Sequence, residues 1–168
     1  MRQLIIFSIL AISFNTSAQS VQLLQKEIDS TIWKPFQKAF ETLDGEALNA
    51  TYAEDVLRVT PEGIDTENSF KVKNLERFVQ NKKEGISITL DFWFDSRRTN
   101  ETTSYEVGFY RIGFKNSKNE TTFSYGQFHI VLEKLDGQWK ITQDWDTNII
   151  KGKSIGEADF SIKRPLRF

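Results

Sequence analysis

Apolar side chains in the first third of the chain recur every three or four residues, which is the spacing of one helix face. This face comprises Val21, Leu24, Ile28, Ile32, Phe36, Phe40 and Leu43. Pro35 interrupts the pattern and predicts a kink or a restart near residues 33–34, because proline cannot donate the helical hydrogen bond. Asp44 can cap a second short helix containing Leu48 and Tyr52. Two consecutive helices are therefore expected here.

A short strand and a third helix are expected next. Val56 to Thr60 has the composition of a strand, which Pro61 ends. Residues 66–84 carry a helical pattern with Val72, Leu75, Phe78 and Val79 on one face, and Gly85 suits the position after its end. From residue 86 the apolar period changes to two, which is typical of half-buried strands. The expected strands are 86–95, 103–114, 121–134 and 139–148.

The dipeptide Asp136-Gly137 predicts a two-residue hairpin turn, because both central residues of a type I′ turn have positive φ. This turn aligns the last two strands in three pairs: Leu135 with Gln138, Glu133 with Lys140, and His129 with Asp144. The preceding turns extend the last pair into a row of Trp93, Glu106, His129 and Asp144. The strand alternation places this row on one face of the sheet.

The opposite face is expected to meet the helices. It collects Phe92, Phe94, Tyr105, Val107, Phe109, Phe128, Ile130, Leu132, Trp139, Ile141 and Trp145. A pocket lined from this face could be reached by polar or amphipathic side chains, and these candidate ligand-binding residues are Trp33, Tyr52, Arg58, Tyr105, Arg111, Gln143 and Trp145. Aromatic walls with a few polar groups are typical of small-molecule cavities. The alternative is that the aromatic residues are only core and that the two arginines lie at the surface.

Candidate catalytic residues come from the row on the other face, which holds the only His of the chain. Glu106 and Asp144 would flank His129, raise its pKa and orient its ring, so that the three could transfer protons. The alternative is that the row is plain surface or a contact with a partner. A transition-metal site is not expected at these carboxylates, because one His and no Cys leave too few nitrogen and sulfur ligands. Neither a metal nor a cofactor is expected.

Composition narrows the class of protein. The chain has 168 residues, a net charge of −1 and 14 Phe. This length suits one domain with a sizeable core, and the aromatic content argues against disorder. A charge near zero gives no general attraction to nucleic acid or to an anionic membrane. The absence of Cys excludes disulfides and Cys nucleophiles.

Residues 1–18 have the pattern of a secretory signal. Arg2 supplies the positive charge, residues 4–14 are mostly apolar, and Ser17-Ala18 offers small residues for cleavage. An apolar run of this length is too short to span a bilayer. The expected product is exported, periplasmic or secreted, with a domain over 19–148 and an irregular basic tail over 149–168.

Short motifs then resemble the nuclear transport factor 2-like superfamily, which includes SnoaL-like and ketosteroid isomerase-like branches. The segment Tyr52–Val56 resembles the entry to the first strand of that fold. The segments 125–128 and 136–141 resemble its closing hairpin. The resemblance covers about residues 21–148. It implies an α+β fold in which three helices pack on a strongly curved, cone-shaped antiparallel sheet that surrounds a pocket.

The same resemblance adds two expectations. In the isomerase-like branch the catalytic groups lie inside the cone, so a β-bulge would be needed to turn the row of Glu106, His129 and Asp144 inward. The paired acid and Tyr of that branch have no clear matches in this chain. In the superfamily two sheets often pack outer face to outer face, which would make the row part of a homodimer interface.

Three functions stay open at this point. The preferred one is an exported domain that binds a small apolar or aromatic molecule. The second is a cofactor-free isomerase, cyclase, dehydratase or hydrolase that works by general acid–base catalysis. The third is a structural homodimer whose cavity is filled. An open cavity separates the first two from the third, and a buried carboxylate or His in contact with that cavity favours an enzyme.

Overall fold

The computed structural model describes residues 20–160 and residue 168, so the predicted signal peptide lies outside the described residues. Residues 20–42 are helical throughout, and the irregularity predicted near Pro35 is a π-helical turn, η1 (Asp29–Trp33). The N–H of Lys34 donates to Asp29 O, and Pro35 lies in the first turn of α2 (Lys34–Thr42). The wider turn leaves Pro35 without the clash that it would cause inside a regular helix.

Two further helices follow the prediction with one correction. Asp44 caps α3 (Gly45–Asn49), and its Oδ1 accepts from Ala47 N–H at 2.9 Å. Tyr52 was expected in this helix, but it is the first residue of β1, because the chain turns at residues 50–51. The third helix, α4 (Ser69–Lys83), ends before Gly85, whose φ of +67° few other residues adopt.

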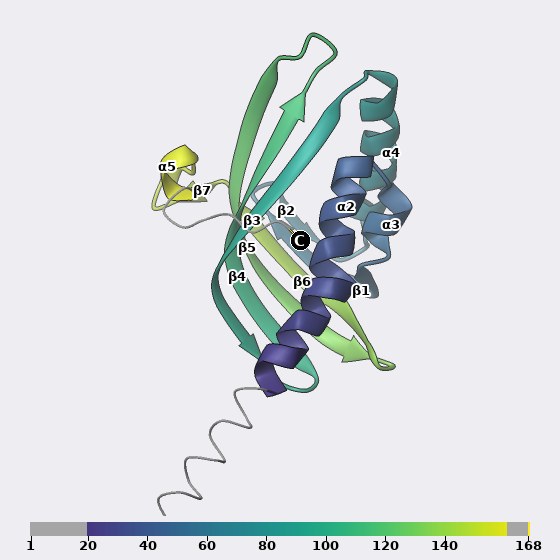
Figure 1. Cartoon of the computed structure of the whole chain (residues 1–168), viewed down its shortest axis with the longest axis vertical. Helices are drawn as coiled ribbons and strands as arrows, with labels where there is room; N and C mark the ends of the chain where they lie inside the picture. The colour runs from purple at the N-terminus through teal and green to yellow at the C-terminus, as the bar shows by residue number, and fades with distance from the viewer. Residues whose placement is uncertain (1–19, 161–167) are drawn as a thin grey trace, which may run out of the picture.

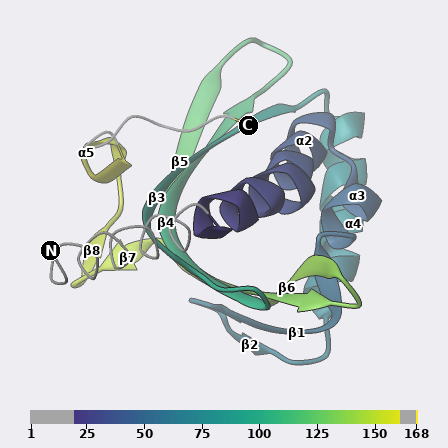
Figure 2. The same cartoon turned by 60° about the horizontal axis from the view of Figure 1, so that its bottom comes forward.

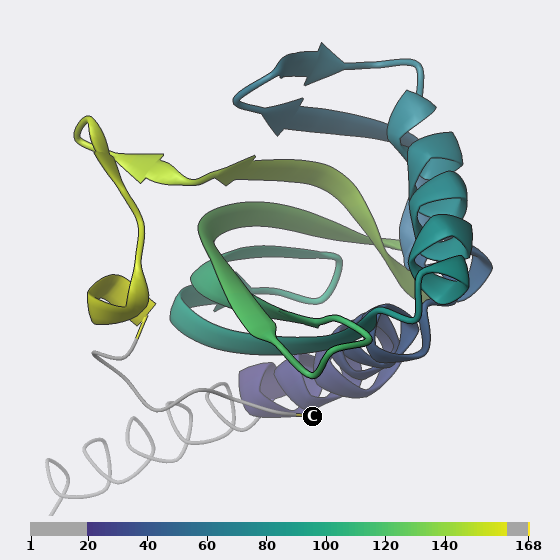
Figure 3. The same cartoon turned by 90° about the horizontal axis from the view of Figure 1, so that it is seen from above.

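One sheet of six strands carries the fold. Its strands are β1 (Tyr52–Thr60), β2 (Gly63–Asp65), β3 (Ser87–Thr99), β4 (Thr103–Lys115), β5 (Thr121–Leu135) and β6 (Gln138–Thr147). Their order is β2-β1-β6-β5-β4-β3, with β1 and β6 parallel and the other pairs antiparallel. The sheet curves strongly, and α2, α3 and α4 close its concave side (Figure 1, Figure 2). Seen from above, the strands wrap around the space that the helices cover (Figure 3).

The core lies between the concave face and the helices. Large buried side chains include Ile28, Ile32, Trp33, Leu48, Phe78, Leu90, Phe128, Leu132, Trp139 and Ile141. Each contributes roughly 1.5–3 kcal/mol by burial. The apolar face expected for α4 is wrong in part, because Val72 and Val79 are 57% and 52% exposed while Phe70 and Phe78 are buried. The inward face of α4 therefore runs through Phe70 and Phe78.

The pairing of β5 with β6 follows the prediction near the turn and departs from it further along. Asp136 and Gly137 have φ of 49° and 80°, and the pairs Leu135–Gln138 and Glu133–Lys140 are confirmed. A bulge at Thr142 then shifts the register by one residue, so that His129 faces Trp145 and not Asp144. One extra residue reverses the side to which every later side chain points.

The predicted alignment of β4 with β5 is also wrong by one residue. The loop 116–120 leaves Lys115 opposite Thr121, so that Glu106 pairs with Ile130 rather than with His129. Ile130 belongs to the core, so Glu106 also points inward. By the same shift, Tyr105, Val107 and Phe109 leave the predicted core face and lie on the convex face, where the bulge in β6 also places Trp145.

The segment after β6 is more regular than expected. A short hairpin, β7 (Ile149–Ile150) and β8 (Lys153–Ser154), leads into α5 (Glu157–Phe160). Phe160 is buried against the convex face, where the Arg111 guanidinium lies 5.0 Å from its ring centroid. The prediction of an irregular tail is therefore wrong for residues 149–160. Within the described part of the chain, no helix is both long enough and apolar enough to cross a membrane.

Candidate functional site

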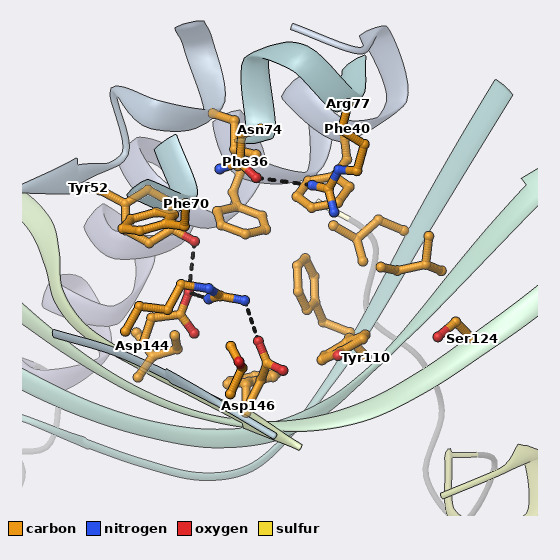
Figure 4. A pocket seen from close by; sticks show the side chains of 18 of the residues that line it. Phe36, Phe40, Tyr52, Phe70, Asn74, Arg77, Tyr110, Ser124, Asp144 and Asp146 are labelled. Atoms are coloured by element: carbon orange, nitrogen blue, oxygen red, sulfur yellow. Dashed lines mark hydrogen bonds and ion pairs between the residues drawn. The ribbon is translucent and has the colours of Figure 1, made fainter. Parts of the chain in front are cut away.

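A cavity of about 340 Å³ lies inside the cone, between the concave face and helices α2 and α4. Aromatic side chains form a large part of its wall, as the close view in Figure 4 shows for several of the rings. The aromatic lining consists of Trp33, Phe36, Phe40, Tyr52, Phe70, Phe92, Tyr110, Phe114 and Phe128. Several of these rings meet edge to face, including Trp33 with Phe92 at 5.0 Å between centroids. Edge-to-face contacts hold the rings at the cavity wall.

One wall of the cavity is polar. The Tyr52 hydroxyl donates to Asp144 Oδ2 at 2.8 Å, and Arg58 donates to both Asp144 and Asp146. Arg58 comes from β1, opposite Asp144 on β6. The bulge at Thr142 brings the two carboxylates to this side of the sheet, because without it they would point outward. The polar wall thus depends on one extra residue in β6.

Burial and the charges of Arg58 and the two carboxylates together set the pKa values of this polar wall. Burial raises the pKa of Asp146 above its ordinary value, although the Arg58 charge acts in the opposite direction. The pKa of Tyr52 rises well above its ordinary value through burial and the nearby Asp144 charge. For Arg58, burial lowers the pKa and the two carboxylates raise it, with a net rise. Arg58 therefore stays charged, and Tyr52 stays a hydrogen-bond donor.

The mouth of the cavity opens between β1, β2 and α4. A more open hollow of about 720 Å³ adjoins the cavity there, and Arg58, Phe70, Asn74 and Arg77 line both. The Arg77 guanidinium lies 5.5 Å from the Phe40 ring centroid and donates to Asn74 Oδ1 at 3.2 Å. In Figure 4 Arg77 lies on the helical side of the cavity, across from Tyr110. A ligand entering from the hollow would pass this guanidinium.

A second buried carboxylate lies on the same face, away from the cavity lining. Glu106 is fully buried and accepts from Trp33 Nε1 at 2.7 Å, Arg97 at 3.0 Å and Ser104 at 2.9 Å. Arg97 also pairs with Asp29 of η1 at 2.7 Å. Burial raises the pKa of Glu106, although the Arg97 charge and hydrogen bonds lower it. These groups join the first helix to the sheet.

The predicted catalytic row is not one cluster. Asp144 lines the cavity, Glu106 is buried elsewhere on the concave face, and His129 lies on the convex face. His129 Nδ1 is 2.5 Å from the Tyr105 hydroxyl, and its ring contacts Trp145 with centroids 4.6 Å apart. Burial lowers the pKa of His129, so the expected rise is wrong. The rise needed flanking carboxylates, and the true register supplies Tyr105 and Trp145 in their place.

The predicted ligand-binding set divides in the same way. Trp33, Tyr52 and Arg58 line the cavity. The other four lie on the convex face, which the register errors assigned to the wrong side: Tyr105, Arg111, Gln143 and Trp145. Arg111 bonds there to Asp91 at 2.8 Å. Arg111 lies two residues from Phe109 and six from Tyr105, and these even spacings place all three on one face, so a single register error moved them together.

The sequence analysis missed several polar residues of the lining, among them Asn74, Arg77 and Asp146. Asp146 would be recognised only if the bulge were known. Asn74 and Arg77 could have been found, because together with Phe70 and Phe78 they follow a helical spacing of three or four residues. The apolar pattern Val72, Leu75 and Val79 masked this stripe. No group of three His, Cys, Asp or Glu side chains within residues 20–160 is arranged to hold a metal ion.

No family model matches the sequence. Solved structures with the same architecture are similar at low identity. An NTF2-like protein of unknown function from Shewanella oneidensis is 20% identical, with a TM-score of 0.54 over 73% of this chain and 98% of that one. A candidate dehydratase of the NTF2-like family from Streptomyces avermitilis is 10% identical, with a TM-score of 0.61 over 77% and 99%.

A candidate scytalone dehydratase from Novosphingobium aromaticivorans is 16% identical, with a TM-score of 0.59 over 82% of this chain and 93% of that one. These likenesses and the curved sheet with its three covering helices define the class: an α+β protein with a cavity inside a cone. The chain has the nuclear transport factor 2-like fold, as the motifs in its first strand and closing hairpin implied.

Proposed function

We propose that the protein binds a small molecule with an aromatic or otherwise apolar body inside the cone. The observation that carries the proposal is a cavity of about 340 Å³ with aromatic walls and one polar wall. This volume lies near the lower end of the usual range of ligand pockets, roughly 300–1,000 Å³. The rings of Phe36, Phe92 and Tyr110 would contact the ligand, and Tyr52, Asp144 and Arg58 would orient it.

The open cavity argues against a purely structural role. A close-packed interior has few voids larger than a water molecule, because each void forfeits contacts on its walls. A domain whose only task was to dimerise would gain stability by filling this space. The lining instead keeps several aromatic faces uncovered beside buried polar groups.

Calorimetric titration with a neutral bicyclic probe, 2-naphthamide, tests binding. We expect saturable binding, and Ile112→Trp should abolish it, because Ile112 lines the cavity and a larger side chain would occupy the space. Leu135→Trp at the exposed hairpin turn is the matched control and should leave affinity unchanged. Trp33, which lines the cavity, is the suitable fluorescent reporter, whereas Trp145 lies on the convex face. Absence of binding to the wild type would contradict the proposal.

A second candidate function is general acid–base catalysis on the bound molecule. It is favoured by the two carboxyl groups of the polar wall, one of which, Asp146, has a raised pKa. Carboxyl groups with raised pKa can exchange protons near neutral pH. The candidate dehydratases with the same fold also favour it. Against it, Arg58 engages both carboxylates, which suits positioning better than proton transfer.

Deuterium exchange separates the two candidates. If Asp146 is a base, the protein should accelerate exchange of the α-protons of 2-tetralone in D₂O, as followed by mass spectrometry. The carboxylate would take a carbon-bound proton to leave an enolate, which would then accept a deuteron. Asp146→Asn should return exchange to the buffer rate. Exchange in the wild type no faster than in buffer would rule out this candidate and leave binding as the function.

We also propose that the protein is exported and that its convex face pairs with a second copy. Export is supported by the charged and apolar pattern of residues 1–18. The intact mass of the protein recovered from outside the cytoplasm should begin near Gln19, and a mass that includes residues 1–18 would contradict export. Pairing is supported by Tyr105, which is 41% exposed beside His129 and Trp145.

A further inference from the structure

Arg77 differs from the three partly buried arginines of the sheet. Each of three arginines pairs with two acidic side chains: Arg58 with Asp144 and Asp146, Arg97 with Asp29 and Glu106, and Arg111 with Asp91 and Glu157. Arg77 forms no ion pair with any acidic side chain in residues 20–160. A cation at the mouth of a cavity therefore lacks a protein counter-charge.

Neutral amides hold this cation in place. Arginine only donates, so Asn74 must turn its oxygen toward Arg77, at 3.2 Å, and its nitrogen toward Asn49 Oδ1, at 3.1 Å. Asn49 then donates from its own nitrogen to Lys71 O at 2.9 Å. The chain of amides links α4 to α3 and orients the guanidinium without neutralising it.

Arg77 is exposed to solvent at the mouth of the cavity, but its immediate surroundings disfavour its charge. Burial lowers its pKa from the ordinary value, and the positive charge of Arg58 lowers it further. Its guanidinium lies against the rings of Phe40 and Phe78, at 5.5 and 5.1 Å from their centroids, which stabilises a cation only partly. Glu62, the remaining acidic residue of the lining, is exposed on the turn after β1. An anion bound beside Arg77 would supply the missing counter-charge.

We propose that the ligand carries a carboxylate, which Arg77 binds at the mouth of the cavity while the apolar body lies among the aromatic rings. The planar guanidinium matches a carboxylate with two parallel hydrogen bonds. A single arginine and a cavity of about 340 Å³ suit one carboxylate on a small ring system. This inference rests on the proposed function and adds the class of ligand, a small aromatic or alicyclic acid.

Two probes of the same shape test the inference: 2-naphthoate, which is charged, and 2-naphthamide, which is neutral. Calorimetry on the wild type should give at least tenfold tighter binding of 2-naphthoate, since charge-assisted hydrogen bonds are roughly twice as strong as neutral ones. Arg77→Gln should remove the preference, because it takes away the charge that distinguishes the two probes. Lys73→Gln, which changes a cation that lines only the outer hollow, is the control and should keep the preference.

The possible failures are distinct. Equal affinity for both probes in the wild type, or a preference that survives in Arg77→Gln, would overturn the carboxylate site and leave the binding function standing. Failure of both probes to bind would overturn the proposed function as well. If Arg77→Gln does not fold, salt decides: 2-naphthoate binding to the wild type and to Lys73→Gln should weaken between 20 and 500 mM NaCl, and 2-naphthamide binding should not. An equal response of both probes to salt would overturn the inference.

Discussion

Two networks of carboxylate and arginine lie on the concave face, and only one of them meets a cavity. The Glu106 carboxylate is closely packed, and Trp33, Arg97 and Ser104 all donate hydrogen bonds to it. Asp144 and Asp146 also have donors, Tyr52 and Arg58, but these two carboxylates line the cavity. Both networks hold a carboxyl group whose pKa is raised by burial. A raised pKa alone therefore does not identify a functional site, and access to open space does.

The two networks also differ in how the chain builds them. Glu106 points inward by the ordinary alternation of β4. Asp144 and Asp146 point inward only because Thr142 is an extra residue in β6. A bulge beside a binding site re-aims side chains that regular pairing would expose. The network at the cavity is therefore the one that a change of register would destroy.

The largest effect should come from a change of register at Thr142. Deletion of both Thr142 and Gln143 should turn Asp144 and Asp146 outward and force Trp145 inward. We expect a loss of more than about 4 kcal/mol in the free energy of unfolding, measured by urea denaturation. Deletion of Thr142 alone is the control and should cost less, because it keeps the direction of the following side chains. A double deletion no more harmful than the single deletion would contradict this account of the bulge.

Removal of one carboxylate from each network should lower the free energy of unfolding by different amounts in the packed network and in the one at the cavity. Glu106→Ala should cost about 3 kcal/mol or more, because in a closely packed site it leaves the buried N–H of Trp33 without an acceptor and leaves Arg97 with Asp29 alone. Asp146→Ala should cost about 1 kcal/mol, since Arg58 keeps Asp144 and faces a space that water can enter. Denaturant titrations of the two variants measure both losses. Equal losses would indicate that the cavity is closed to water.

The free energy of unfolding should depend on pH in the direction expected for Glu106, whose pKa is raised in the folded protein. The folded protein binds a proton at Glu106 more tightly than the unfolded chain, whose pKa is about 4.5. The stability that this group contributes is thus present below pH 4.5 and lost as pH rises through the folded pKa. The difference in unfolding free energy, wild type minus Glu106→Gln, should fall as pH rises. A difference that rises would show that Arg97 outweighs burial.

Asp65 provides the matched control of opposite sign. Hydrogen bonds from Ser69 and from backbone N–H groups lower its pKa to about 2, from 3.8. The difference between wild type and Asp65→Asn should therefore rise with pH between about 2 and 3.8. Both differences can be followed by chemical denaturation in the same buffers.

The smallest effect on the fold should come from His129, outside the cone. His129→Ala removes a contact with Tyr105 and Trp145 on the convex face, and unfolding should become easier by less than about 1 kcal/mol. If a second copy covers this face, sedimentation should show weaker dimerisation while 2-naphthamide still binds. Unchanged assembly of wild type and variant would contradict pairing through this face.

Local patterns were sufficient to predict the helices up to residue 83 and the five longer strands, but not β2 or the elements after residue 148. The period of the apolar residues predicted the helices and the long strands, and Asp136-Gly137 predicted one hairpin with its turn. These features depend on neighbours in sequence, so a pattern reveals them. The π turn before Pro35 was predicted as an irregularity but not by type, because its geometry depends on packing against the sheet.

The candidate site could be predicted only in part, because two registers shift by one residue. The run Thr142-Gln143-Asp144 is polar throughout, so no apolar residue marks which side faces the core. The loop 116–120 likewise offers several ways to align β4 with β5. Trp33, Tyr52 and Arg58 precede both shifts and were assigned to the correct side. The residues assigned to the wrong side lie in β4 and β6, which the two shifts affect.

A crystal structure of the protein with 2-naphthoate tests the central claim most directly. The account predicts the naphthyl ring between Phe36, Phe92 and Tyr110, with its carboxylate on Arg77. Difference density at a concentration that saturates binding in solution would locate the probe. A cavity filled by its own side chains, or a probe bound only on the convex face, would contradict the account.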